Sequence, residues 1–174
     1  VVRDRRLADK SQSKGFERDN DAIGSTDAPF TSALFSNITF LGPKAVDDKF
    51  QNTNEYINGG DMFPNNGSGL GRFQAAMQIR RGSRLYCINS IAYGFAIGLI
   101  LDGEKGDTQE QANKGNLRLQ NLWFANMDIT GSDANKLYED VLVTGYASNK
   151  KPIKDPTKPS FSTTFIKAQE GNKE

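Results

Sequence analysis

Three segments of the chain repeat one pattern, in which apolar residues surround an asparagine and a Gly or Asn follows five positions later. The segments are 34–42 (LFSNITFLG), 85–94 (LYCINSIAYG) and 117–126 (LRLQNLWFAN), and their first asparagines are Asn37, Asn89 and Asn121. Such a repeat constrains the fold strongly, because equivalent units of a repeat protein stack on one another. Asparagine suits a stacked turn, since it tolerates left-handed backbone geometry and can bond along a stack of strands about 4.8 Å apart. The alternative is that three unrelated strands share an asparagine.

A second set of segments alternates with the first: 15–21 (GFERDND), 76–82 (AMQIRRG) and 98–103 (GLILDG). Short β-rich runs of two alternating kinds, each ended by Gly, Asn or Asp, favour a solenoid that adds one strand to each of two or more parallel sheets per turn. We therefore predict an all-β fold, a right-handed parallel β-helix (solenoid) segment with long loops and an irregular C-terminal tail.

The sequence is predicted to divide into two parts at residue 127. Residues 1–127 are predicted to form the β-helix, and residues 128–174 a C-terminal capping segment or tail. Loop 45–73, rich in Asn and Gly, is a candidate recognition surface or a solvated insertion. Loop 102–115 is predicted to hold a short helical turn, and the capping and spacing signals of 132–142 (SDANKLYEDVL) favour a short helix.

Composition excludes several kinds of chemistry. The absence of histidine excludes Ser-His-Asp and Cys-His catalysis and every zinc site that uses imidazole. The single cysteine, Cys87, excludes an intrachain disulfide and is expected to be a buried small hydrophobic residue. A net charge of +1 gives no field that would attract nucleic acid, and no apolar run is long enough for a transmembrane segment. The first residue is Val1 and not Met, which suggests a processed form or a fragment.

An acidic run provides the first candidate site. Glu17, Asp19 and Asp21 alternate along an expected strand, so their side chains share one face and repel one another unless a cation or a basic neighbour is present. Ca²⁺ takes carboxylate ligands in flexible geometry, which makes Asp19 and Asp21 candidate metal ligands. The alternative is that a basic side chain pairs with the carboxylates across stacked strands. The basic candidates are Arg18, Arg80 and Arg81.

The same residues suggest two modes of binding. Arg80 and Arg81 are candidates to bind the carboxylates of an acidic polysaccharide. Trp123 has the opposite strand parity to Phe124, so Trp123 is the candidate exposed platform for a sugar ring, whereas Phe124 and Phe95 are expected in the core.

Four segments together resemble large β-helix-containing surface proteins of Bacteroidota. They are 13–26 (SKGFERDNDAIGST), 35–43 (FSNITFLGP), 75–83 (AAMQIRRGS) and 88–103 (INSIAYGFAIGLILDG), and the resemblance covers residues 1–127. The acidic run matches the Glu-x-Asp-Asn-Asp motif that this family carries. The resemblance implies an extracellular or outer-membrane surface location, often as a lipoprotein, and a longer parent chain. It implies no catalytic residues, because the family has no agreed ones.

These observations favour a non-enzymatic surface protein, a binding or structural module for a glycan or a neighbouring protein of an outer-membrane complex. The alternative is a calcium-dependent polysaccharide lyase or glycoside hydrolase on the same solenoid, which for hydrolysis needs a carboxylate pair about 5 to 9.5 Å apart beside a groove. We also expect the edge next to Val1 to be covered, either by upstream turns of the parent chain or by another subunit, because an open sheet edge invites aggregation.

Overall fold

The computed structural model of the chain describes residues 13–50 and 73–174. Its strands are β1 (Ser13–Arg18), β2 (Leu34–Ser36), β3 (Thr39–Leu41), β4 (Phe73–Arg80), β5 (Leu85–Tyr93), β6 (Ile97–Asp102), β7 (Leu117–Ala125), β8 (Ile129–Ser132), β9 (Leu142–Tyr146) and β10 (Pro152–Asp155). Its helices are the 3-10 helix η1 (Pro43–Ala45) and the α-helices α2 (Thr108–Asn113) and α3 (Phe161–Ala168).

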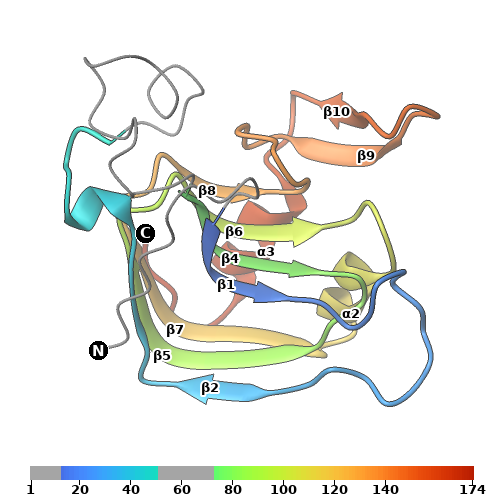
Figure 1. The fold of residues 1–174 in the computed structure, drawn as a ribbon, viewed down its shortest axis with the longest axis horizontal. Coiled ribbons are helices and arrows are strands. Elements are labelled where there is room, and N and C mark those ends of the chain that lie inside the picture. Colours follow the sequence, from blue (N-terminus) through green and yellow to red (C-terminus); the bar gives the residue numbers. More distant parts are fainter. Residues whose placement is uncertain (1–12, 51–72) are drawn as a thin grey trace.

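The strands from β1 to β8 alternate between two parallel sheets (Figure 1). Sheet A has the order β1-β4-β6-β8. In sheet B, β2 and β3 pair with successive parts of β5, and β7 also pairs with β5. The two sets of sequence segments therefore correspond to the two sheets.

The repeated asparagines mark a bend that runs across sheet B. Asn37, Asn89 and Asn121 have φ values of 57°, 51° and 54°, which lie in the left-handed region that Asn tolerates better than most residues. Their neighbours pair in register, with Ser36 opposite Ile88 and Ile88 opposite Gln120. The asparagines therefore occupy equivalent places on adjacent strands, as the repeat predicts.

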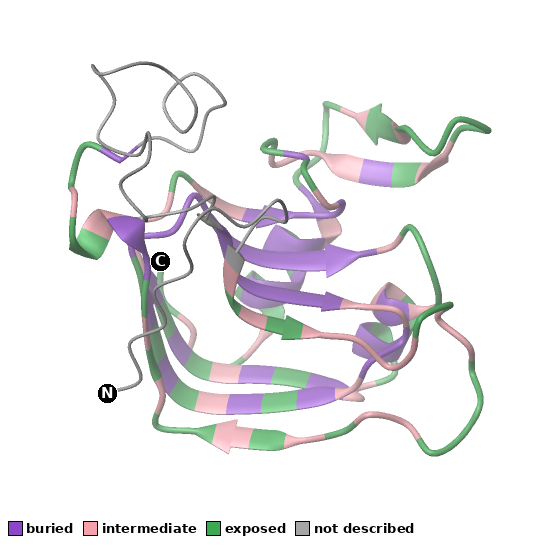
Figure 2. Ribbon diagram, viewed as in Figure 1, coloured by how far each residue is buried: buried purple, intermediate pink, exposed green. Residues whose placement is uncertain are grey.

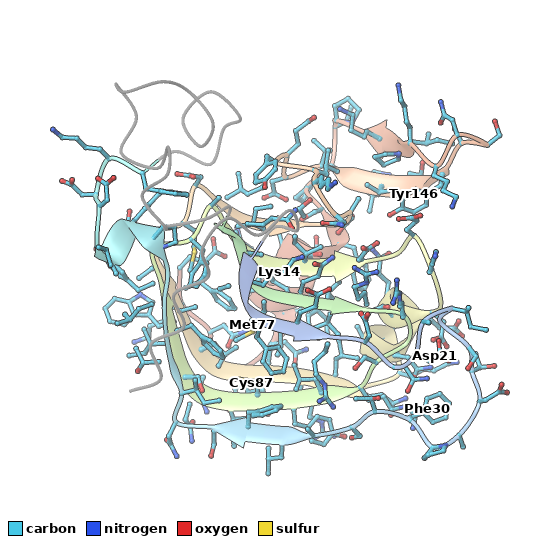
Figure 3. All side chains as sticks on the ribbon, viewed as in Figure 1. Lys14, Asp21, Phe30, Met77, Cys87 and Tyr146 are labelled. Carbon is cyan, nitrogen blue, oxygen red and sulfur yellow. The ribbon has the colours of Figure 1, made fainter. Side chains whose placement is uncertain are left out.

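The main core lies between the sheets. Along β5 and β7, buried and exposed residues alternate on either side of the bend, so one face of sheet B packs inward (Figure 2). Met77 from sheet A and Cys87 from sheet B are both buried in this core (Figure 3). Burial raises the pKa of the Cys87 thiol. Phe95 and Phe124 are also core residues, as predicted.

The chain after β8 departs from the repeat. Strands β9 and β10 form a separate antiparallel pair, and α3 packs against β6 and β8. Phe165 and Ile166 of α3 enter the main core. A buried carboxylate holds this region together, because Asp133 accepts hydrogen bonds from the start of both β9 and α3.

The predicted fold class, an all-β right-handed parallel β-helix, is wrong. The described chain is a mixed structure that consists of two parallel sheets, an antiparallel pair of strands, and α-helices. The alternation between the two parallel sheets ends at β8, and α3 then contributes Phe165 and Ile166 to the main core. The division into domains at residue 127 stays a prediction.

Shorter predictions had mixed outcomes. The helical turn in loop 102–115 is α2, but segment 132–142 holds no helix: it runs from the end of β8 through bends and a turn to the start of β9. Most of loop 45–73, the candidate recognition surface, lies outside the described residues, as does Val1. No helix within the described residues has the length and apolar content needed to cross a bilayer.

Candidate functional site

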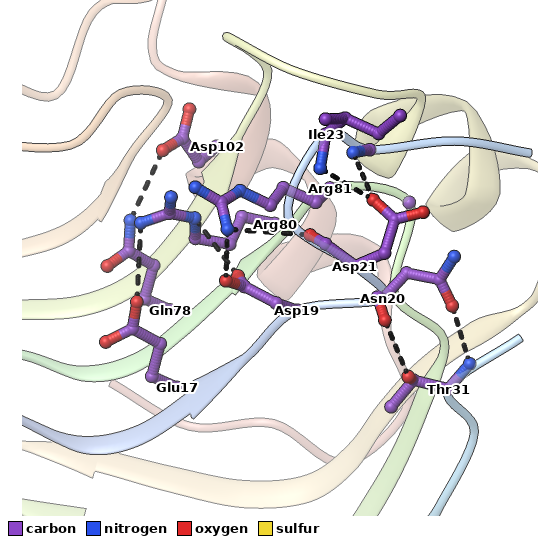
Figure 4. Close-up of polar contacts among 12 residues, drawn as sticks. Glu17, Asp19, Asn20, Asp21, Ile23, Thr31, Gln78, Arg80, Arg81 and Asp102 are labelled. Atoms are coloured by element: carbon purple, nitrogen blue, oxygen red, sulfur yellow. Dashed lines mark hydrogen bonds and ion pairs between the residues drawn. The ribbon is translucent and has the colours of Figure 1, made fainter.

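The acidic run leaves the end of β1 beside two arginines at the end of β4 (Figure 4). Parallel pairing with Glu17 opposite Gln78 brings Arg80 next to the run. Arg80 Nη1 lies 3.3 Å from Glu17 Oε1, and Arg80 Nε lies 3.0 Å from Asp19 Oδ1. Arg81 Nη1 donates to Asp19 Oδ2 at 2.9 Å. Of the two alternatives left open by the sequence, this geometry supports pairing with basic side chains.

Arg81 makes its contact from an unusual backbone position. Its φ of 57° lies in the left-handed region, where bulky residues are rare. From this turn the Arg81 side chain reaches Asp19 and the main-chain oxygen of Asp21. Burial raises the pKa of the Asp19 carboxyl, and the nearby positive charges of Arg80 and Arg81 only partly oppose this effect.

The rest of the acidic run shapes the loop that follows β1. Asn20 Oδ1 accepts from the Thr31 main-chain N–H at 2.7 Å. Asp21 accepts hydrogen bonds from the main-chain N–H groups of Ile23, Gly24 and Ser25 and from the Ser25 hydroxyl. The Ser25 hydroxyl, followed by the main-chain donors, lowers the pKa of Asp21 to about 2. The carboxylate of Asp21 is therefore occupied by its own loop.

Metal binding finds no support in this arrangement. Within residues 13–50 and 73–174, no three His, Cys, Asp or Glu side chains lie close enough together to hold a metal ion. Asp19 faces two guanidinium groups, and Asp21 faces main-chain N–H groups. Calcium binding by Asp19 and Asp21 stays a prediction.

A small polar hollow of about 70 Å³ lies beside the arginines, where β4 and β6 end. It is lined by Arg80, Arg81, Asp102, Glu104 and Lys105. Asp102 is buried, accepts from Gln78 Nε2 at 3.3 Å and from the Glu104 N–H at 2.9 Å, and has a pKa that burial raises. The hollow has room for only a few water-sized groups, which is far less than the usual ligand pocket of about 300 to 1,000 Å³.

The outer face of sheet B is a larger candidate. The alternation along the strands turns one set of side chains away from the core, and pairing in register arranges them in rows that cross the sheet. The rows are Leu34-Tyr86-Arg118, Ser36-Ile88-Gln120, Thr39-Ile91-Trp123 and Leu41-Tyr93-Ala125. We call this set of twelve residues the outer face. Parallel sheets are usually covered on both faces, so an exposed face that carries aromatic residues is unusual in a parallel sheet.

Trp123 occupies the outer face as predicted. Its side chain is 50% exposed, beside Ile91 at 40% and near Tyr93 at 38%. Of the six predicted site residues, five form the cluster at the ends of β1 and β4 and the loop after β1, whereas Trp123 belongs to the other sheet. The structure therefore gives two separate groups of residues and not one site.

Sequence reasoning missed most of the outer face. The parity argument that placed Trp123 outside applies equally to Ile91, which pairs with Trp123, and to Tyr93, which lies two residues further along β5 and so has the same parity. Asp102 and Gln78 were also missed, and no local pattern marks them, since each sits in an otherwise apolar or mixed strand. Comparisons with protein-family models, curated proteins and solved structures found no match to this chain. The resemblance to Bacteroidota surface proteins stays a prediction.

Proposed function

We propose that the chain is a non-enzymatic binding module that binds a glycan on the outer face of sheet B. The observation that carries the proposal is the half-exposed Trp123, with Ile91 and Tyr93 beside it. Aromatic rings that keep one face in water offer large apolar contact at little entropic cost, and sugar rings stack on such faces.

The periodicity of the sheet also supports a polymeric ligand. Asn37, Asn89 and Asn121 are exposed along the bend, each next to the row that contains Trp123. Adjacent strands place these amides about 4.8 Å apart. A polysaccharide that crosses the strands would meet the same donor and acceptor on each strand, with the aromatic residues alongside.

The occupied carboxylates favour binding over the alternative of a calcium-dependent lyase or glycoside hydrolase. Glu17 and Asp19 are both held by Arg80, so they are poorly placed to act as a free acid and base. An extracellular or outer-membrane location, and a neighbouring surface protein as a second partner, are part of the proposal and rest on the family resemblance alone.

The test is affinity electrophoresis of the whole chain through gels that contain one polysaccharide each. Suitable probes are hydroxyethyl cellulose, arabinoxylan and polygalacturonate. At least one is expected to retard the chain, and Trp123→Ala should weaken that retardation about tenfold, or about 1.4 kcal/mol. Ile153→Ala, which removes an exposed apolar side chain from β10, is the matched control and should leave the retardation unchanged. Retardation that survives Trp123→Ala would refute the proposed face.

A further inference from the structure

The two edges of sheet B differ. At β7, the chain's own C-terminal segment 170–173 adds itself to the edge: Lys173 lies parallel to Trp123, and its N–H donates to Leu122 O at 2.8 Å. The N–H of Phe124 donates to Lys173 O at 2.9 Å. The Asn172 side chain completes the contact, because it accepts from the Leu122 N–H and donates to Leu119 O. An extended segment therefore satisfies the main-chain groups of this edge.

The opposite edge, formed by β2 and β3, has main-chain groups that point away from the sheet. Ala33 O and the Asn37 N–H bond to β5 before the bend, and Ile38 O and the Gly42 N–H bond to β5 after it. Because alternate residues of a parallel strand face opposite neighbours, the intervening residues direct their N–H and C=O groups outward. These residues are Leu34, Ser36, Thr39 and Leu41. Within the part of the chain that the structure describes, no strand pairs with this side of β2 and β3.

The side chains at this edge are apolar, although an exposed edge strand usually carries residues that prevent it from pairing with another chain. Leu34 is 66% exposed and Leu41 is 62% exposed. Edge strands of soluble proteins normally carry lysine, proline or a bulge that prevents pairing with another chain. A pair of exposed leucines on an unpaired edge instead favours pairing.

Within residues 13–50 and 73–174, the core is also less completely covered at this end. Phe16, Phe35 and Phe40 form an aromatic cluster, with ring centroids 5.0 Å apart for Phe16 and Phe35 and 6.3 Å apart for Phe16 and Phe40. All three are only partly buried, whereas Phe165 and Ile166 of α3 are buried at the other end of the core. The cluster provides an apolar surface on which the inward side chains of one more strand can pack.

We propose that the outer edge of β2 and β3 accepts an extended strand from a partner polypeptide, paired parallel to β2 and β3 and packed on Phe16, Phe35 and Phe40. Parallel pairing follows from sheet B, in which every pairing between strands is parallel. The bend at Asn37 sets a further requirement, because the partner strand must also bend there. It therefore needs Asn or Gly at the matching place. This edge and the proposed glycan contact at Trp123 lie on opposite sides of β5, because β2 and β3 pair with one side of β5 and β7 pairs with the other.

The experiment is amide hydrogen exchange of the whole chain, resolved by NMR, without and with a synthetic peptide. The peptide carries the sequence of residues 34–42, LFSNITFLG, with two lysines added at each end for solubility. In the free chain, the amides of Leu34, Ser36, Thr39 and Leu41 should exchange freely, while the Asn37 and Gly42 amides are protected. The peptide should slow the four outward amides by roughly tenfold or more. A control peptide with valine in place of its asparagine should not, because a β-branched residue disfavours the left-handed bend.

A chain variant separates main-chain pairing from nonspecific adhesion. Ser36→Pro removes one outward donor and no bond to β5, so the variant should keep its melting temperature and lose the effect of the peptide. If Ser36→Pro does not fold, Leu34→Lys with Leu41→Lys carries the same test, because charge at an edge opposes pairing.

Three results would overturn the inference. The first is protection of the four outward amides in the free chain, which would mean that the edge is already covered. The second is an unchanged exchange rate with the peptide, or equal slowing by the control peptide. The third is slowing that rises with protein concentration alone, which would identify a second copy of the chain as the occupant.

Discussion

Replacement of Asp133 by alanine should destabilise the protein more than any other removal of a single carboxylate discussed above. Asp133 is fully buried and accepts four hydrogen bonds. The donors are the N–H groups of Val143 at 3.1 Å, Phe161 at 2.9 Å and Ser162 at 3.0 Å, and the Ser162 hydroxyl at 2.9 Å. Through these bonds one side chain fixes β9 and the start of α3 against β8.

The magnitude follows from the donors that the substitution leaves unpaired. A buried donor without an acceptor costs about 1 to 3 kcal/mol. The Ser162 hydroxyl has a single proton, which Ser132 O at 2.6 Å can accept in place of the carboxylate. Water is expected to enter the space left by the carboxylate and reach some of the three N–H groups. We therefore expect Asp133→Ala to lower the free energy of unfolding by about 4 kcal/mol, and the melting temperature by roughly 8 to 16 °C. Asp133→Asn retains one acceptor oxygen and should cost about half as much.

Urea unfolding followed by far-ultraviolet circular dichroism measures these differences. The control is Asp128→Ala, which removes an exposed carboxylate paired with Lys44 and should change the free energy of unfolding by less than about 1 kcal/mol. A loss below about 1 kcal/mol for Asp133→Ala would refute the argument, since it would mean that α3 does not depend on this carboxylate for its place in the core.

Three further predictions concern the acidic groups and the close turn beside β3. Asp102→Asn should stabilise the protein near neutral pH, because burial raises the pKa of Asp102 and ionisation of its carboxyl therefore costs stability. The protonated carboxyl of the wild type avoids this cost below the unfolded pKa of about 3.9, and the wild type loses that stability as pH rises through the raised folded pKa. Urea unfolding of wild type and variant from about pH 3 to about pH 7 should show the advantage of the variant growing with pH, and a constant difference would contradict the assignment. Ser25→Ala should raise the pKa of Asp21 from about 2, as followed by carboxyl NMR titration, because the Ser25 hydroxyl is the main cause of the shift; an unchanged value would assign the shift to the main-chain donors. Gly42→Ala should lower the melting temperature, because its Cβ would lie 2.4 Å from Gly94 O, whereas Gly145→Ala, whose Cβ meets nothing within 4 Å, is the control.

Local patterns predicted the paired strands well, because the information that forms them is itself local. Strand periodicity separates Trp123 from Phe124, and the asparagine bend needs only a residue that tolerates a positive φ. Since the segments that share a pattern stack in register, the same patterns also brought Arg80 next to the acidic run.

The C-terminal part could not be predicted in this way. Segment 132–142 has a helical capping signal, but the Asp133 carboxylate bonds to Phe161 and Ser162, which are distant in the sequence. These tertiary contacts override the local helical propensity of the segment. The fold class was wrong for the same reason, because a repeat that spans only part of a chain does not determine how the rest closes the core. The choice between calcium and arginine for the acidic run also depended on side-chain geometry that sequence spacing does not contain.

The most direct test of the proposed function uses Trp123 as a probe, because it is the chain's single tryptophan and lies on the proposed glycan-binding face. Its fluorescence should be quenched by iodide in the free protein. Titration with the polysaccharide that retards the chain in affinity electrophoresis should then protect it in a saturable manner. A shift of its emission to shorter wavelength should accompany the protection, since a stacked sugar ring removes water from the indole. Saturable polysaccharide binding that leaves both the emission and the quenching of Trp123 unchanged would show that the glycan binds elsewhere, and would contradict the account.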